Sequence, residues 1–132
     1  MSIYCGTDII EVERIEKAIK EHSNETENIF LNKIYTRKEI EYCESRGRVK
    51  YQHFAARFAA KEAIFKAISS LLKDKYEISW QNAEILNNEN GKPEVIFKNI
   101  SKELEEKIIH IDISLSHIKE YAVAMVVVES KN

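Results

Sequence analysis

A chain of 132 residues has the length of one domain, so we expect 1–132 to form a single domain that buries roughly two thirds of the surface its unfolded form exposes. Its 44% hydrophobic and 32% charged residues, with 3 Gly and 1 Pro, exclude the disordered, collagen-like and low-complexity classes. Twenty basic and 22 acidic residues give a net charge of −2, which disfavours a general nucleic-acid binder.

The first half of the chain is expected to form one strand followed by helices. Its short, partly β-branched start predicts a strand over 3–9. Thr36 and Glu39 fit a capping box, which marks a helix start. Apolar residues at helical spacing predict helices over about 11–22, within 24–34, over 36–45 and over 51–72. The longest helix carries an apolar stripe, formed by Phe54, Phe58, Phe65, Ile68 and Leu72.

The second half indicates paired strands. A turn signal at 90–93 separates short elements, which are strands over 77–80, 83–86 and 94–97 and a helix over 100–108. Alternation over 109–116 predicts a strand with one solvated face, whereas the continuously apolar 121–128 predicts a strand buried on both faces. This order favours the α+β class, an antiparallel sheet packed against a long helix and shorter helices. No strand–Gly-rich-loop–helix unit supports a P-loop or Rossmann fold.

The sequence carries no pattern of export or membrane insertion. Charged residues from Asp8 onward exclude a signal peptide in the first 20 residues, and the eight-residue apolar run at 121–128 is too short to span a membrane. Cys5 and Cys43 form neither a CxxC pair nor a disulfide framework. We therefore expect a cytoplasmic protein with reduced thiols and no membrane partner.

Basic side chains are concentrated between residues 46 and 66. Six occur there against one acid, Glu62, and the six are Arg46, Arg48, Lys50, Arg57, Lys61 and Lys66. The cluster is either a solvated helix face with a basic loop or a binding site for a phosphate-rich ligand.

Four polar residues are candidates for a functional site. For each of them, the sequence alone leaves both a structural and a functional role open. Glu62 and Lys66 are spaced i,i+4 and form an ordinary surface pair in the first interpretation. In the second, Glu62 is a partly buried carboxylate in a site and needs a cation, which is either Lys66 or a metal. Asp8 closes the first strand, where it caps the next helix or takes part in a site. His117 continues the apolar phase of its strand, so it is a core residue or a functional one.

Three segments resemble one family, the holo-[acyl-carrier-protein] synthases, which are small phosphopantetheinyl transferases. The first segment is Gly6-Thr7-Asp8 with Arg14, and the second is Arg57-Phe58-Ala59-Ala60-Lys61-Glu62-Ala63 with Lys66-Ala67. The third is Ser114-Leu115-Ser116-His117 with Glu120-Tyr121-Ala122, and the turn Asn90-Gly91-Lys92-Pro93 matches as well. The resemblance covers nearly the whole chain. It departs at Ile68-Ser69-Ser70-Leu71, where the family usually has a Gly-rich turn.

The resemblance implies a 4'-phosphopantetheinyl transferase-like fold and a specific reaction. Family members transfer 4'-phosphopantetheine from coenzyme A to a serine of apo acyl carrier protein, in support of fatty acid synthesis, and release adenosine 3',5'-bisphosphate. It implies Mg²⁺ held by Asp8 and Glu62, catalysis by Glu62 and Lys66, and carrier-protein recognition by Arg14. It also implies homotrimers with sites between subunits, and contacts to coenzyme A from Arg48, Lys50, Arg57, Lys66, Pro93, Ser116 and His117.

Two rival functions use some of the same residues. A Mg²⁺-dependent nucleotide pyrophosphohydrolase would use both carboxylates with water as the nucleophile, although such enzymes usually carry more acids on one helix. A non-catalytic module that binds a carrier protein would not need Asp8, Glu62 and Lys66 together. The sequence does not say which carrier protein is preferred or whether acyl-coenzyme A is used.

Overall fold

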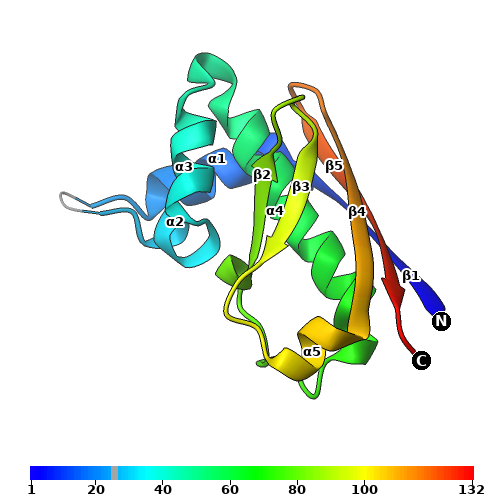
Figure 1. The fold of residues 1–132 in the computed structure, drawn as a ribbon. Helices are drawn as coiled ribbons and strands as arrows, with labels where there is room; N and C mark the ends of the chain where they lie inside the picture. Colours follow the sequence, from blue (N-terminus) through cyan, green and yellow to red (C-terminus); the bar gives the residue numbers. More distant parts are fainter. Residues whose placement is uncertain (25–26) are drawn as a thin grey trace.

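The computed structural model of the chain describes residues 1–24 and 27–132. Its helices and antiparallel strands occur largely in separate runs along the chain, as is typical of the α+β class (Figure 1). The strands are β1 (Ser2–Glu11), β2 (Ala83–Asn87), β3 (Pro93–Phe97), β4 (Ile108–His117) and β5 (Tyr121–Ser130). The helices are α1 (Val12–Glu21), α2 (Ile29–Ile34), α3 (Arg37–Glu44), α4 (Lys50–Ile68) and α5 (Lys102–Lys107). 3₁₀ turns lie at Gly47–Val49, Ser69–Leu71 and Trp80–Asn82.

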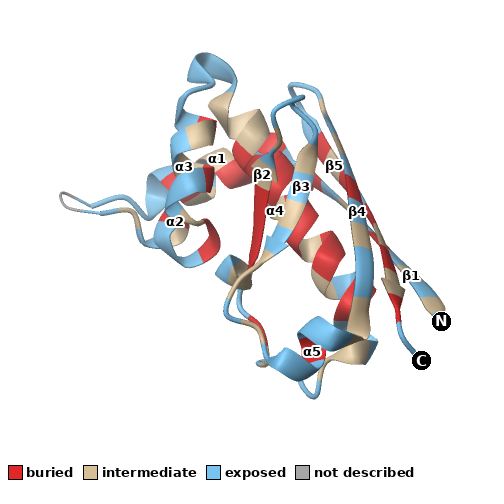
Figure 2. Cartoon of the chain, in the orientation of Figure 1, coloured by how far each residue is buried: buried red, intermediate tan, exposed pale blue. Residues whose placement is uncertain are grey.

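The strands form two antiparallel groups on either side of α4. β1, β5 and β4 make a sheet in that order, with β5 in the centre, and β2 and β3 form a hairpin. Figure 1 shows α4 between this sheet and the hairpin. The helix is therefore buried along most of its length (Figure 2).

Small residues bring α4 and β1 into close contact. Gly6 of β1 faces Ala63 of α4, and a Cβ atom at Gly6 would lie 2.1 Å from the carbonyl oxygen of Ala63. Ala59, Ala63 and Ala67 repeat at four-residue intervals and are all buried. Because these side chains are short, the backbone of the helix can approach the sheet.

Most of the expected elements are confirmed, with shifted ends. The Thr36 hydroxyl and the Glu39 carboxylate form both hydrogen bonds of the predicted capping box at the start of α3. The helix expected within 24–34 is α2, which spans Ile29–Ile34, and residues 25 and 26 of that range lie outside the described residues. α4 ends at Ile68 rather than at residue 72, and the chain continues through the 3₁₀ turn.

Two expectations about strands are wrong. The segment 77–80 is not a strand: it forms bends that lead into the 3₁₀ turn, where Ser79 and Asn82 cap each other. β5 is buried on one face only, since Ala122, Ala124, Val126 and Val128 face α4, whereas Met125 on the other face is 50% exposed. The three-stranded sheet carries a helix on one side, so its outer face is left open within one copy of the chain.

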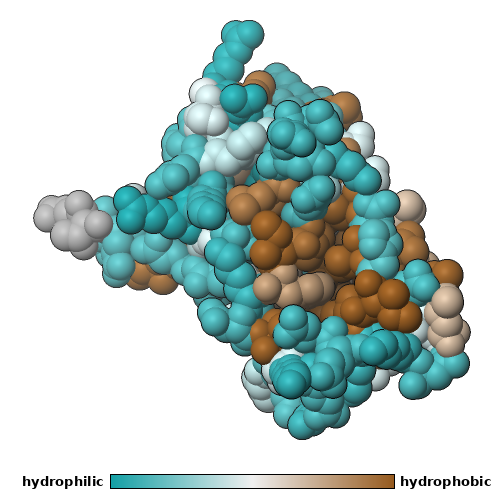
Figure 3. All heavy atoms as spheres, in the orientation of Figure 1, coloured by the Kyte–Doolittle hydropathy of each residue, from teal (hydrophilic) through white to brown (hydrophobic). Residues whose placement is uncertain are grey.

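Apolar side chains also reach the surface beside the β2–β3 hairpin. Figure 3 shows them gathered between β3 and β4, above α5. Half-buried residues of these elements, Val95, Phe97, Ile108 and Ile111, pack against the core. None of the described helices combines the length and apolar character that a membrane span requires.

Candidate active site

The first group of predicted residues lies where β1 crosses α4. Asp8 follows Gly6 by two residues on β1, so its side chain faces the helix. The Lys66 ammonium lies 3.0 Å from Oδ1 of Asp8 and donates a hydrogen bond of 3.0 Å to the Thr7 carbonyl oxygen. Lys66 thus forms its ion pair across to the strand, and Asp8 does not act as a helix cap: α1 has Glu11 at its N-cap position.

Glu62 lies within the electrostatic reach of the same residues. Burial raises the pKa of the Glu62 carboxyl, and the neighbouring Asp8 carboxylate raises that pKa further, while Lys66 and Arg14 lower it. Arg14 comes from α1 and is exposed. Hence β1, α1 and α4 bring together Asp8, Arg14, Glu62 and Lys66, as the resemblance implied. We call these four residues the carboxylate cluster.

The donor set of this cluster suits Mg²⁺ better than a transition metal. Asp8 and Glu62 supply two carboxylates, and among the described residues no group of three His, Cys, Asp or Glu side chains converges as a complete metal site. Mg²⁺ is commonly held by one or two carboxylates and completes its shell with phosphate oxygens and water. The raised pKa of Glu62 beside Asp8 marks a place where a cation would relieve repulsion between two carboxylates.

The second group of predicted residues lines a cavity of about 330 Å³ between α4, β4 and the β2–β3 turn. Arg57, Pro93 and His117 are all part of its wall. The other lining residues are Tyr42, His53, Ala56, Asn87, Gly91, Lys92, Ile113, Ser114 and Leu115. The cavity therefore combines cationic and aromatic side chains. We call it the basic cavity.

Arg57 is the central cation of the basic cavity although it is only 2% exposed. Its Nη2 donates to Oδ1 of Asn87 at 3.0 Å, and its guanidinium carbon lies 4.3 Å from the ring centroid of Tyr42. Its Nε is buried and makes no hydrogen bond to any described residue, nor does a carboxylate among them pair with it. A buried guanidinium with an unused donor is suited to bind an anionic ligand.

Two histidines pack against each other in the same cavity. The rings of His53 and His117 are 4.7 Å apart, and Nδ1 of His117 lies 2.8 Å from Oε1 of Gln52. Burial, with smaller contributions from His117, Arg57 and Arg46, lowers the pKa of His53 to about 4. Burial and Arg57 also lower the pKa of His117. Both shifts favour the neutral form of the ring, and His117 faces α4 as its phase predicted.

The remaining predicted contacts lie outside both groups. Arg48 is exposed in the 3₁₀ turn at Gly47–Val49, and Lys50 pairs with Glu44 at 3.1 Å. Ser116 is exposed on the outer face of the sheet, opposite to His117. Within a single chain, these three residues therefore do not join the basic cavity.

One member of the basic cluster has a different role. Lys61 is fully buried and pairs with Glu39, so it is not part of a solvated face or of an open phosphate site. Sequence reasoning also did not single out Tyr42, His53, Asn87 and Lys92, which line the cavity. Only Lys92 had a signal, because it lies within the turn that matches the family.

The carboxylate cluster and the basic cavity lie on different sides of α4. Arg57 and Glu62 are five positions apart, which corresponds to about 140° around a helix of 3.6 residues per turn. The cavity is lined from α3, β2, β3 and β4, whereas the cluster is formed with β1 and α1. The two groups therefore do not share one pocket within a single chain.

Comparison with known proteins places this arrangement in a family. Residues 4–126 match the family model of the 4'-phosphopantetheinyl transferase superfamily. A holo-[acyl-carrier-protein] synthase of Ruminiclostridium cellulolyticum is 44% identical over 130 residues, which is 97% of this chain and 92% of that protein. One of Fusobacterium nucleatum is 44% identical over 131 residues, 97% of this chain and 99% of that protein. The chain belongs to the 4'-phosphopantetheinyl transferase superfamily.

Solved structures support the same fold. A holo-(acyl-carrier-protein) synthase of Bacillus anthracis in complex with CoA (3',5'-ADP) has a TM-score of 0.74 and 34% identity, with 97% of this chain and 96% of that chain covered. A holo-[acyl-carrier-protein] synthase of Helicobacter pylori in complex with coenzyme A has a TM-score of 0.77 and 30% identity, with 95% and 99% covered. The expected transferase fold is therefore confirmed.

Proposed function

We propose that the protein is a holo-[acyl-carrier-protein] synthase, which transfers 4'-phosphopantetheine from coenzyme A to a serine of apo acyl carrier protein. The observation that carries this proposal is the Asp8–Lys66 ion pair, with Glu62 within electrostatic reach of both residues, in a member of this family. Incubation with coenzyme A and apo carrier protein, followed by intact mass measurement, tests it. Modification of the serine is expected. Cleavage of coenzyme A without modification would indicate a hydrolase, and binding alone would indicate a non-catalytic module.

The carboxylate cluster is the proposed centre of the reaction. Asp8 and Glu62 would hold Mg²⁺, which when bound polarises phosphoryl oxygens and offsets charge on the phosphate groups. Glu62, directly or through a water it holds, takes the proton of the attacking serine, because its carboxyl has a raised pKa and faces the same site. Lys66 stabilises the leaving group with its ammonium or protonates it.

Lys66→Ala is expected to lower kcat by a factor on the order of 10²–10³, with a smaller change in coenzyme A affinity, because charge develops on the leaving phosphate in the transition state. Lys66→Arg should recover only part of the rate, since a planar fork replaces a point charge. Steady-state kinetics at saturating carrier protein measure both variants. If the Asp8 ion pair were the only role of this half-exposed lysine, kcat would not change.

The basic cavity is the proposed site for the nucleotide end of coenzyme A. Arg57, Pro93 and His117 line it. Arg48 lies just before α4 and Lys50 is the first residue of that helix, at the same end as Arg57. The buried guanidinium with its unused Nε suits the 3'-phosphate of the nucleotide.

Arg57→Ala is expected to weaken binding of coenzyme A more than binding of dephospho-coenzyme A, since only the first ligand carries the 3'-phosphate. Isothermal titration of the two ligands gives the ratio of their dissociation constants. A loss that is equal for both ligands would place Arg57 at another part of the nucleotide.

We also propose that the protein works as a homotrimer with its sites between subunits. The carboxylate cluster and the basic cavity face away from each other within one chain, so a complete site needs a second copy. The outer face of the sheet supports this, because Ile3, Ile9 and Met125 are exposed there beside Ser116. Light scattering would show a mass of three chains, and a monomer that is active on its own would refute the shared site.

Two further assignments complete the proposal. Arg14 lies exposed beside the carboxylate cluster, where it can meet the acidic surface of a carrier protein. The reaction would serve fatty acid synthesis in the cytoplasm.

A further inference from the structure

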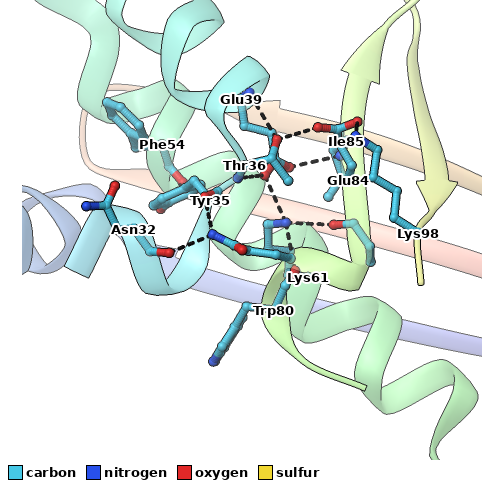
Figure 4. Close-up of polar contacts among 12 residues, drawn as sticks. Asn32, Tyr35, Thr36, Glu39, Phe54, Lys61, Trp80, Glu84, Ile85 and Lys98 are labelled. Carbon is cyan, nitrogen blue, oxygen red and sulfur yellow. Dashed lines mark hydrogen bonds and ion pairs between the residues drawn. The ribbon is translucent and has the colours of Figure 1, made fainter. Parts of the chain in front are cut away.

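A fully buried ion pair lies next to the basic cavity. Nζ of Lys61 on α4 is 3.0 Å from Oε1 of Glu39 on α3, and both side chains are 0% exposed (Figure 4). Lys61 also donates to the carbonyl oxygens of Trp80 at 2.9 Å and Ala83 at 2.6 Å. The ammonium thus has an acceptor for each of its three protons.

Glu39 is equally well satisfied. Its Oε1 accepts a hydrogen bond of 2.8 Å from the Thr36 amide, and its Oε2 accepts one of 2.9 Å from the Ile85 amide on β2. Buried ion pairs of this kind add little net stability, since the cost of removing both charges from water offsets their attraction. Stability alone is therefore a weak reason for two charges at this place.

The pair lies one helical turn from Arg57. Lys61 follows Arg57 by four residues on α4, and Tyr42 follows Glu39 by three residues on α3. Lys61 contacts Glu39, and Arg57 contacts Tyr42, so α3 and α4 meet at two successive levels. Glu39 therefore lies about one helical turn along the α3–α4 contact from the Arg57 guanidinium.

Glu39 and Arg57 also share two neighbours, Tyr35 and Cys43. Both Glu39 and Arg57 act on the pKa values of Tyr35 and Cys43, although burial is the main cause of their rise. Arg57 also acts on the pKa of Lys61, which burial lowers. Yet among the described residues Arg57 has only an amide oxygen and an aromatic ring as partners, and its charge is left unpaired.

We propose that Lys61 is a positioning residue: by neutralising Glu39, it leaves the Arg57 guanidinium in the basic cavity free to bind the phosphate of the nucleotide. Without Lys61, the buried Glu39 carboxylate loses its ion-pair partner, and Arg57 lies one helical turn before the vacated position on the same helix. The guanidinium would then turn from the cavity toward α3 and lose its anionic ligand. This inference rests on the proposed function, since it takes coenzyme A as the ligand.

The experiment measures the dissociation constants of coenzyme A and dephospho-coenzyme A by isothermal titration in Lys61→Met, Glu39→Gln and the double variant. Lys61→Met should lower the preference for coenzyme A by about ten-fold, the lower end of the loss seen when a partner that orients a metal-binding side chain is removed. The double variant should recover the preference, because no carboxylate remains to capture Arg57. Glu39→Gln alone should retain it.

A purely structural role gives a different pattern. Thermal unfolding would then report loss of stability in these variants while the ratio of the two dissociation constants stays at the wild-type value. A wild-type ratio in folded Lys61→Met, or a double variant that does not recover, overturns the proposal. Lys98→Met is the matched control, because it breaks the neighbouring Glu84–Lys98 pair of 2.8 Å, and it should leave the ratio unchanged.

If Lys61→Met does not fold, a second variant tests whether a carboxylate beside Arg57 lowers the preference for coenzyme A. Asn87→Asp places a carboxylate beside Arg57 at an exposed position without touching the buried pair. It should lower the preference for coenzyme A, and an unchanged preference overturns the proposal. Failure of the wild-type protein to bind either nucleotide would overturn the proposed function itself, whereas a wild-type protein that binds both leaves only the role of Lys61 to be decided.

Discussion

Asp8→Ala and Glu62→Ala are each expected to abolish Mg²⁺-dependent transfer while the fold survives. The proposed Mg²⁺ site consists of two neighbouring carboxylates. With only one of them left, the protein binds Mg²⁺ weakly and the ion stays mostly hydrated in solution. A metal that stabilises charge in the transition state contributes several kcal/mol, so loss of about 4 kcal/mol corresponds to about 10³-fold in rate. Intact mass measurement of the carrier protein over a Mg²⁺ titration gives these rates.

Glu103→Ala is a matched control for this prediction. Like Asp8, Glu103 is a carboxylate paired with a lysine, here Lys73 at 3.0 Å, but it is more exposed and lies on α5, away from the carboxylate cluster. Its removal should leave the rate and its Mg²⁺ dependence unchanged. A near-wild-type rate for Asp8→Ala or Glu62→Ala at low Mg²⁺ would contradict the assignment of these residues as metal ligands.

Gly6→Ala is expected to destabilise the protein by about 3 kcal/mol or more, the upper range for inserting a methyl group into a packed core. The added Cβ would lie 2.1 Å from the carbonyl oxygen of Ala63 and 3.1 Å from the amide nitrogen of Ala67. Both are backbone atoms, so the clash is relieved only by moving β1 away from α4. Chemical denaturation measures the loss, and transfer activity should fall as well, because Asp8 moves with the strand.

Gly47→Ala shows how much of this loss comes from glycine itself. Gly47 has φ +63° and no atom within 4 Å of an added Cβ, so its replacement carries only the strain of a left-handed backbone, about 1 kcal/mol. If Gly6→Ala cost less than Gly47→Ala, the close approach of β1 and α4 would not be the reason for Gly6.

Sequence patterns within a few residues predicted those elements that are stabilised by contacts between residues close in sequence. Thr36 and Glu39 lie three residues apart, so the capping box was visible in the sequence and is confirmed. The two apolar residues at Ile78 and Trp80 carried no information about a partner strand, and the segment forms bends instead. The continuously apolar sequence of β5 predicts burial on both faces, yet its outer face is open, because hydropathy does not say how many copies of a chain cover a sheet.

The site was predictable through the family motifs and only partly through charge. Lys61 and Lys66 are both lysines of one helix, yet one is fully buried and the other bonds a strand almost 60 residues away. Charge counting treats them alike, since it does not say which face of a helix is covered. The basic cavity needed the fold as well, because α3, β2 and β4 each supply part of its wall.

The pairing of β1 with β5 sets the order in which this chain can fold. Gly6 pairs with Val126, so nearly the whole chain lies between two strands that must meet. Closing so long a loop costs entropy before any contact is gained, and topologies of this kind fold slowly. Contacts among α3, α4 and the β2–β3 hairpin are closer in sequence and are expected to form first. Until β5 pairs with β1, the edge of β1 and its apolar side chains remain accessible to other chains. Aggregation is therefore most expected before this sheet has formed.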